Sequence, residues 1–350
     1  MTKNLLKTLF SKPGFCMGKM LIKNIFGIKT LFFVQLKPTF RCNMKCPFCQ
    51  VHKYGTKLYP LNKEMTTKEI KDILKKLYDN NACVLNLTGG EPCLRKDIVE
   101  IIDFSKKTGY IVLMNTDGTL IHRFLDDKRF VNGIDSLRIS IDSVKNHDKI
   151  RNTKGAYKKI IKNIKLAKKK KMDVMINSVI TKENYKEMED LCKLAQKLDC
   201  KISLTPVTST DFTVTTKKNV VFQGIKKVQK KKFIDKVRSL KKKYKNLSNT
   251  SFYLRHLENK EEINKKCSVL DYALNILPDG TISLPCETFT KEKISIKNKN
   301  VDEVLNSKKF KKYKKLTGKF NVCKDCESRC NTFPQQILNP INLIDFIRNW

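Results

Sequence analysis

The sequence predicts an α/β fold built on a parallel sheet. Short, nearly continuous apolar runs recur at wide spacing, which is typical of strands buried on both faces. Most of these runs are separated by segments whose apolar residues follow helical spacing. Because strand and helix alternate, we expect right-handed crossovers and a sheet that is either open or rolled into a partial barrel. With 350 residues, 40% of them hydrophobic, the chain can build two domains, or one large barrel with an appendage.

The expected elements follow in chain order. Six strands are expected over residues 31–36, 83–87, 110–114, 136–141, 173–180 and 201–204. Helices are expected over 67–77, 157–168 and 184–198, the first of them capped by Thr66 or Thr67. After residue 207 the pattern changes to a basic segment, 225–245, which we expect to be an exposed helix joining domains. The turn Pro278-Asp279-Gly280 between two alternating runs predicts a β-hairpin.

These elements suggest five segments. A basic amphipathic N-terminal segment covers residues 1–30, the barrel 31–215 and a basic helical linker 216–251. A cysteine-rich α+β domain is expected over 252–335, followed by a tail at 336–350. The N-terminal segment either packs against the barrel or lies at a membrane surface. The sequence shows neither a membrane-spanning stretch nor a secretory signal, so we expect a cytoplasmic protein, with peripheral membrane contact as the alternative.

The net charge of +38 raises the question of a nucleic-acid partner. Only 10 of the 72 basic residues are Arg, and Arg is the side chain that specific phosphate and base recognition favours. The lysines are also spread along the whole chain. A solvated lysine coat therefore accounts for the charge, and attraction to anionic lipid or nucleic acid is the alternative.

Three cysteines follow the first expected strand, in the segment Cys42-Asn-Met-Lys-Cys46-Pro-Phe-Cys49. They lie at the carboxyl end of that strand, which is where parallel βα folds place active sites. Three thiolates at this spacing can hold three irons of a 4Fe–4S cluster and leave the fourth iron open to a ligand. A zinc site is the alternative, with His52 as the fourth ligand.

At these residues the sequence resembles the radical S-adenosylmethionine (radical SAM) family, whose motif has this spacing and an aromatic residue, here Phe48, before the last cysteine. The resemblance covers about residues 31 to 210. Further matches are Gly89-Gly90-Glu91-Pro92 after the second strand, Ser140-Ile141-Asp142 at the end of the fourth, Asn177 in the fifth, and Arg151 within an H-D-x-I-R stretch. The sequence departs from the family at Thr116-Asp117-Gly118, where relatives more often have T-N-G.

The resemblance implies a partial (βα)6 barrel of TIM type in which Cys42, Cys46 and Cys49 hold the cluster. The open iron would chelate the amino and carboxylate groups of SAM. The pair Gly89-Gly90 would let the backbone approach SAM closely. Glu91 lies in the element that meets the SAM ammonium in relatives, and Ser140 and Arg151 are candidates for its carboxylate. The other residues expected near SAM are Phe48, Pro92, Thr116, Asp142 and Asn177.

Five more cysteines lie near the C-terminus: Cys267, Cys286, Cys323, Cys326 and Cys330. This set resembles the SPASM and Twitch extensions of radical SAM enzymes, which carry auxiliary clusters. Five thiols can fully ligate one 4Fe–4S cluster, so we expect one auxiliary cluster, with a structural zinc site as the alternative. The remaining cysteines are expected to be buried apolar fillers: Cys16, Cys83, Cys93, Cys192 and Cys200.

The resemblance implies reductive cleavage of SAM and hydrogen abstraction by a 5′-deoxyadenosyl radical, with an electron donor such as flavodoxin or ferredoxin. The S-I-D and H-D-x-I-R stretches resemble members that modify peptides or proteins. The basic amphipathic N-terminus instead resembles members that modify membrane lipids. A non-enzymatic alternative is a zinc-stabilised basic nucleic-acid-binding protein, for which aromatic RNA-binding signatures are absent from the sequence.

Overall fold

The computed structural model describes residues 30–49, 51, 55–207, 227–259, 267–287 and 289–327, together with residues 18, 22, 23 and 26. Its centre is a nine-stranded sheet with the order β6-β5-β4-β3-β2-β1-β7-β8-β9. The first six strands are mutually parallel, as the sequence predicts. Their bounds are β1 Phe33–Thr39, β2 Val84–Gly89, β3 Ile111–Thr116, β4 Ser136–Ser140, β5 Val174–Ile180 and β6 Lys201–Pro206.

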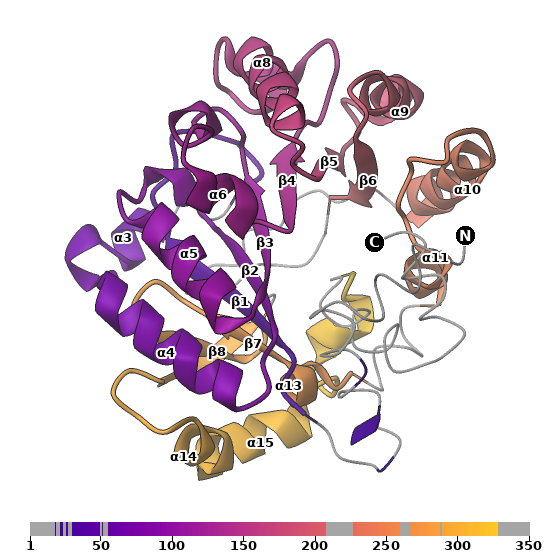
Figure 1. The fold of residues 1–350 in the computed structure, drawn as a ribbon. Helices are drawn as coiled ribbons and strands as arrows, with labels where there is room; N and C mark the ends of the chain where they lie inside the picture. Colours follow the sequence, from indigo (N-terminus) through magenta and orange to yellow (C-terminus); the bar gives the residue numbers. More distant parts are fainter. Residues whose placement is uncertain are drawn as a thin grey trace.

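Helices cover the outer side of this sheet (Figure 1). They are α4 Thr67–Asp79, α5 Ile98–Thr108, α6 Lys128–Gly133, α8 Ala156–Lys169 and α9 Met188–Lys197. Three of them, α4, α8 and α9, confirm the sequence prediction. Thr66 caps α4 in a capping box with Glu69, whose side chain accepts a hydrogen bond from the Thr66 backbone N–H. Short helices complete this part: α3 Thr56–Leu58 and α7 His147–Ile150.

The two faces of the sheet differ in polarity: one is apolar, and the other mixes polar and apolar side chains. Strand residues at alternate positions, such as Leu85, Val112 and Ile139, pack with the helices in a single hydrophobic core. The prediction that the strands are apolar on both faces is wrong for part of the inner face. Beside buried apolar residues such as Val84, Leu113 and Met175, that face carries a set of polar side chains. These are Gln35, Asn86, Asn115, Arg138, Asn177, Ser203 and Asn275, which the strand register places on one side.

The C-terminal region extends the same sheet. Strand β7, Ala273–Ile276, pairs in parallel with β1 on the side away from β2. It forms the predicted hairpin with β8, Thr281–Pro285, and Gly280 adopts a positive φ of 75° in the turn. β9, Thr290–Ser295, adds the last strand. Helices α13 Val269–Tyr272, α14 Val301–Asn306 and α15 Lys308–Leu316 accompany these strands. Within the described residues the sheet is open, with β6 and β9 at its ends, which agrees with a partial barrel.

The basic segment after β6 forms α10, Lys227–Lys243, followed by α11, Ser251–Glu258. The expectation that this helix is exposed is wrong for one side of it, because Phe233, Val237 and Leu240 are buried in the main core. Its lysines occupy the opposite side, as an amphipathic helix requires. No helix of the described residues is long and apolar enough to cross a membrane. The expected amphipathic helix within residues 1–25 lies outside the described residues.

Candidate active site

The three cysteines of the first motif lie on the loop that follows β1. Cys46 is buried, whereas Cys42 and Cys49 are half-buried, and all three are free thiols. The backbone N–H of Cys49 donates to the carbonyl of Cys46 at 3.1 Å, which closes a tight turn between the two thiols. Burial raises the pKa of the Cys42 and Cys46 thiols. The loop thus holds three sulfur donors at the carboxyl end of the sheet, the donor type that an iron–sulfur cluster requires.

The Gly89-Gly90-Glu91 segment packs directly against the start of this loop. Gly90 N donates to the Thr39 carbonyl at 2.9 Å, and Glu91 N donates to the Arg41 carbonyl at 2.8 Å. A Cβ on Gly90 would lie 2.1 Å from the Arg41 oxygen, and one on Gly89 would lie 2.5 Å from the Thr39 oxygen. Because these two residues have no side chain, the backbone at Thr39 and Arg41 can pack directly against them. The expected close approach of SAM to the same pair stays a prediction.

The Glu91 carboxylate is fully buried and satisfied within the protein. It accepts hydrogen bonds from Cys93 N at 2.9 Å, Thr116 Oγ1 at 2.8 Å and Asp117 N at 2.7 Å. Burial, together with repulsion from Asp117, raises the pKa of the Glu91 carboxyl well above its usual range. Two of the predicted site residues, Glu91 and Thr116, are thus bound to each other and join the end of β2 to the end of β3. Pro92 is buried at the start of a short 3-10 turn, Pro92–Leu94.

Arg151 and Asp142 form a buried ion pair beside the cysteine loop. The second arm of the guanidinium, Nη1, lies 3.8 Å from the Cys46 sulfur, and its carbon lies 5.3 Å from the centre of the Phe48 ring. Burial lowers the pKa of Arg151, but attraction to Asp142 and Cys46 outweighs it and raises that pKa. Arg151 also lowers the pKa of the Cys46 thiol against the effect of burial, leaving it at about 11. Four of the predicted site residues, Cys46, Phe48, Asp142 and Arg151, thus lie together, and their roles toward the cluster and SAM stay predictions.

His147 contacts the backbone of Asp142, one member of this ion pair. Its Nδ1 lies 3.2 Å from the backbone nitrogen of Asp142, which donates to it, and the ring is buried. Burial, together with the nearby Arg151, lowers the pKa of His147 to about 4, so the ring is neutral at physiological pH. Asp142 is fixed further by Val179 N, which donates to Oδ1 at 2.8 Å.

Ser140 and Asn177 are partners across β4 and β5 on the inner face of the sheet, and both are half-buried. The Asn177 amide donates to Asn115 Oδ1 at 3.2 Å, and Asn115 donates to Asn86 Oδ1 at 2.7 Å. The side-chain amides of Asn86, Asn115 and Asn177 therefore form a hydrogen-bonded row on the inner face, near the carboxyl edge of the sheet.

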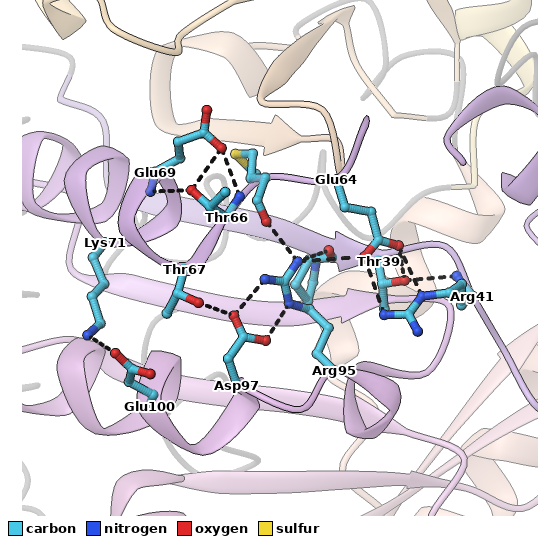
Figure 2. A network of polar contacts seen from close by, with 12 residues as sticks. Thr39, Arg41, Glu64, Thr66, Thr67, Glu69, Lys71, Arg95, Asp97 and Glu100 are labelled. Atoms are coloured by element: carbon cyan, nitrogen blue, oxygen red, sulfur yellow. Dashed lines mark hydrogen bonds and ion pairs between the residues drawn. The ribbon is translucent and has the colours of Figure 1, made fainter. Parts of the chain in front are cut away.

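A polar network that the sequence analysis did not identify holds the residues between β1 and Cys42 in place (Figure 2). Arg95 donates to Asp97 at 2.9 and 2.6 Å and to the carbonyls of Pro38 and Met65 at 3.0 Å each. Glu64 pairs with Arg41 at 3.3 Å and with Arg95 at 3.7 Å. These contacts join the end of β1, the first residue before Cys42 and the start of α4. No local sequence signal links them, because the partners are distant along the chain.

Four of the five C-terminal cysteines are described, and Cys267, Cys286, Cys323 and Cys326 are all half-buried. Cys330 lies outside the described residues. Cys326 N donates to the Cys323 carbonyl at 3.1 Å, the same turn as in the first motif, within the 3-10 segment Asn321–Asp325. Glu287, next to Cys286, pairs with Lys37 of β1. The segment that carries Cys286 is therefore attached to β1 by an ion pair whose lysine is buried.

Among the described residues, no three Cys, His, Asp or Glu side chains converge on a point where they could hold a single metal ion. His52, the expected fourth ligand in the zinc alternative, lies outside them. Of the cysteines expected to be fillers, Cys93, Cys192 and Cys200 are buried free thiols, Cys83 is buried and disulfide-bonded, and Cys16 lies outside the described residues. Cys83 is buried, as expected, whereas its disulfide bond was not predicted from the sequence.

Comparison with known proteins supports this geometry. Residues 36–195 match the model of the radical SAM superfamily, and residues 267–331 match that of SPASM, an iron–sulfur cluster-binding domain. Residues 36–195 therefore form a radical SAM domain, and residues 267–331 an iron–sulfur cluster-binding SPASM domain. A radical SAM domain implies a 4Fe–4S cluster and SAM, and a SPASM domain implies auxiliary iron–sulfur clusters. The first motif lies in the first domain and all five C-terminal cysteines lie in the second.

Relatives of this radical SAM chain differ in what they do. It is 30% identical over 162 residues to an AdoMet-dependent heme synthase of Methanosarcina barkeri, covering 46% of each protein. It is 26% identical over 176 residues to a PqqA peptide cyclase of Bradyrhizobium diazoefficiens, covering 50% of this chain and 45% of the cyclase. The chain spans about half the length of the curated relatives it matches.

Two solved structures share the fold over most of the chain. Streptococcus suis SuiB bound to S-adenosylmethionine covers 90% of this chain and 76% of its own, with a TM-score of 0.61 at 15% identity. The enzyme anSMEcpe with bound AdoMet covers 86% of this chain and 87% of its own, with a TM-score of 0.60 at 19% identity. At these identities the likeness concerns the fold.

Proposed function

We propose that the chain is a radical SAM enzyme that removes a hydrogen atom from a peptide or protein substrate. The observation that carries the proposal is the meeting of three free thiols, a buried arginine and the Gly-Gly-Glu segment at the carboxyl ends of β1, β2 and β4. When bound, a reduced 4Fe–4S cluster with SAM supplies an electron to the sulfonium, which yields methionine and a 5′-deoxyadenosyl radical that abstracts hydrogen.

The residues of this chain would perform the binding and positioning. Cys42, Cys46 and Cys49 would hold the cluster. The Arg151 cation beside Cys46 stabilises thiolate charge there and is a candidate partner for the SAM carboxylate, although its Nε is already bound to Asp142. The backbone hydrogen bonds of Gly90 and Glu91 would hold the start of the loop in place, and the buried Glu91 side chain would help to exclude water from that side of the site.

The inner face of the sheet favours a polar substrate. Its amide row, Asn86, Asn115 and Asn177, offers hydrogen-bond donors and acceptors, and Arg138 adds a positive charge on the same face. A hydrocarbon chain placed there would cover these groups without replacing their hydrogen bonds, which is unfavourable. Peptide groups can replace them. SuiB has been solved bound to its precursor peptide SuiA, and anSMEcpe with a peptide, which is consistent with a peptide substrate here.

Three expectations stay predictions: the lipid-modifying alternative, contact of residues 1–30 with an anionic membrane, and a flavodoxin or ferredoxin electron donor. The polar inner face does not favour the lipid alternative. Flotation with anionic vesicles tests the membrane contact, and absence of binding at physiological salt would contradict it. The cytoplasmic location and the domain boundaries also stay predictions.

Anaerobic reconstitution with iron and sulfide tests the proposal. We expect about eight irons per chain, from two four-iron clusters, and slow release of 5′-deoxyadenosine after dithionite and SAM are added. Cys46→Ala should abolish this release and leave the C-terminal cluster in place. Cys200→Ala, which removes a buried free thiol away from the motif, serves as the control and should keep full activity. Release that survives in Cys46→Ala would contradict the ligand assignment, and about four irons would remove the auxiliary cluster.

A further inference from the structure

A groove outside the proposed site lies between the 3-10 turn Ile121–Arg123, which follows β3, and the start of α8. Its volume is about 580 Å³, which lies within the size range of ligand-binding pockets. Four cationic side chains line it: Arg123, Lys154, Lys159 and Lys162. Arg123 belongs to the turn, Lys154 to the loop before α8, and the two remaining lysines to the helix itself.

These four cations have no counter-ion. Within the part of the chain that the structure describes, none of them forms an ion pair or a side-chain hydrogen bond. Lysines at the other end of the same helix behave differently, because Lys168 pairs with Asp199 at 2.8 Å and Lys170 pairs with Asp126 at 2.9 Å. Lys158 and Lys165 of the same helix also form no ion pair within the described residues, so what distinguishes the four cations is that they line one groove.

The acid that precedes the groove's helix, Asp148, is already used in hydrogen bonds. Asp148 accepts hydrogen bonds from Gly155 N at 2.6 Å and from Tyr157 N at 2.8 Å, which satisfies the N-terminus of α8. The exposed cations, and not the helix terminus, thus remain to attract an anion.

The walls of the groove are fixed to the cysteine loop. Asn43, which lines the groove and directly follows Cys42, donates to Thr119 Oγ1 at 2.8 Å. Asn163 is buried and donates to the Gly118 carbonyl at 2.8 Å, which joins α8 to the end of β3. A molecule held in the groove therefore lies against the same loop that carries the first three thiols.

We infer that this groove binds an acidic segment of the substrate peptide, away from the residue that is modified. The inference rests on the proposed peptide function. The cations are spread over a turn, a loop and a helix, and Lys159 and Lys162 lie one helical turn apart. They therefore match several separate carboxylates along a chain better than one compact anion. Electrostatic attraction of this kind accelerates encounter and sets orientation.

Fluorescence anisotropy with a labelled peptide of alternating Glu and Gly tests the inference, using the full chain with its clusters reconstituted. The variant Lys159→Glu/Lys162→Glu should weaken binding at least about tenfold. The matched control is Lys158→Glu/Lys165→Glu, which makes the same charge change at exposed positions of the same helix outside the groove. We expect less than about a twofold change for this control, and binding that falls steeply as salt rises.

Equal weakening by the two double variants would overturn the inference, because it would show diffuse attraction to the lysine coat. Displacement of the probe by pyrophosphate at lower concentration than by unlabelled peptide would also overturn it, since the occupant would then be a compact phosphate. Release of 5′-deoxyadenosine without substrate is measured in parallel and should be the same in the groove variant and the parent protein. If the parent releases none, the proposed reaction fails, and the anisotropy still decides whether the groove binds acidic peptide.

Discussion

Arg95 should be one of the side chains on which the rigidity of the cysteine loop depends most. It is 7% exposed and makes four hydrogen bonds, two to Asp97 and two to the carbonyls of Pro38 and Met65. Arg95→Ala leaves both carbonyls without this donor, at about 1–3 kcal/mol each. It also removes the cation that faces the buried carboxylate of Glu64. We therefore expect the free energy of unfolding to fall by about 3–5 kcal/mol.

A matched control separates burial from the ion pair itself. Arg129 binds Asp127 through Nε and one terminal nitrogen, at 3.1 and 2.6 Å, with the same two-residue spacing that separates Arg95 and Asp97. Its side chain is 58% exposed. Arg129→Ala should therefore lower the free energy of unfolding far less than Arg95→Ala does, because an exposed ion pair is screened by solvent. Both variants remove a guanidinium that binds an aspartate with two hydrogen bonds. They differ because Arg95 is buried and also donates to two backbone carbonyls, whereas Arg129 is exposed.

Equilibrium unfolding in urea measures both changes, and iron content after anaerobic reconstitution reports the state of the loop. We expect Arg95→Ala to retain less of the first cluster than the parent protein, because the backbone at Pro38 and Arg41 loses its support. Arg95→Lys should recover part of the stability, since lysine keeps the charge but cannot bind Asp97 with two parallel bonds. The reasoning is refuted if Arg95→Ala destabilises the protein no more than Arg129→Ala does.

Three further predictions concern single side chains. Gly90→Ala should prevent loading of the first cluster, measured as iron content, because the added Cβ would lie 2.1 Å from the Arg41 oxygen. Folding lowers the pKa of His147 from an ordinary 6.5 to about 4. Between these two values the unfolded state binds the proton and the folded state does not. The free energy of unfolding should therefore decrease by about 3 kcal/mol as the pH falls from 6.5 to 4. His147→Gln should flatten this dependence in urea titrations, and an unchanged slope would contradict it. Asn115→Leu should destabilise the protein by about 1–3 kcal/mol in the same assay, because it leaves the Asn86 and Asn177 amides without their shared partner.

The order and type of the barrel elements could be predicted because they depend on local patterns. Each of the strands β1 to β6 is a run of apolar residues ending near a polar loop, and α4 starts at a capping box that four residues define. The polar inner face was also present in the sequence, as Asn86 and Asn177 interrupt apolar runs at alternate positions. The apolar residues on both sides of each Asn obscured it, since a nearly continuous apolar run is equally typical of a strand buried on both faces.

What could not be predicted depends on contacts between distant segments. The parallel pairing of β7 with β1 joins residues separated by most of the chain, and no local pattern specifies such a partner. The hydrogen bonds of Arg95 to Pro38 and Met65 have the same character, because an isolated arginine in a loop is typical of an exposed side chain. The cysteine motif was recognisable from spacing, whereas the network that holds it in place was not.

The two cysteine regions are mechanically connected through β1. Its carboxyl end leads into the first three thiols, and its edge pairs with β7, whose hairpin partner β8 ends just before Cys286. Lys37 of β1 pairs with Glu287, the residue after Cys286, in a largely buried ion pair. A displacement of β1 would therefore move ligands of both proposed clusters together. Because one strand supports both, their separation should be insensitive to substrate binding, which suits electron transfer at a fixed distance better than a gated contact.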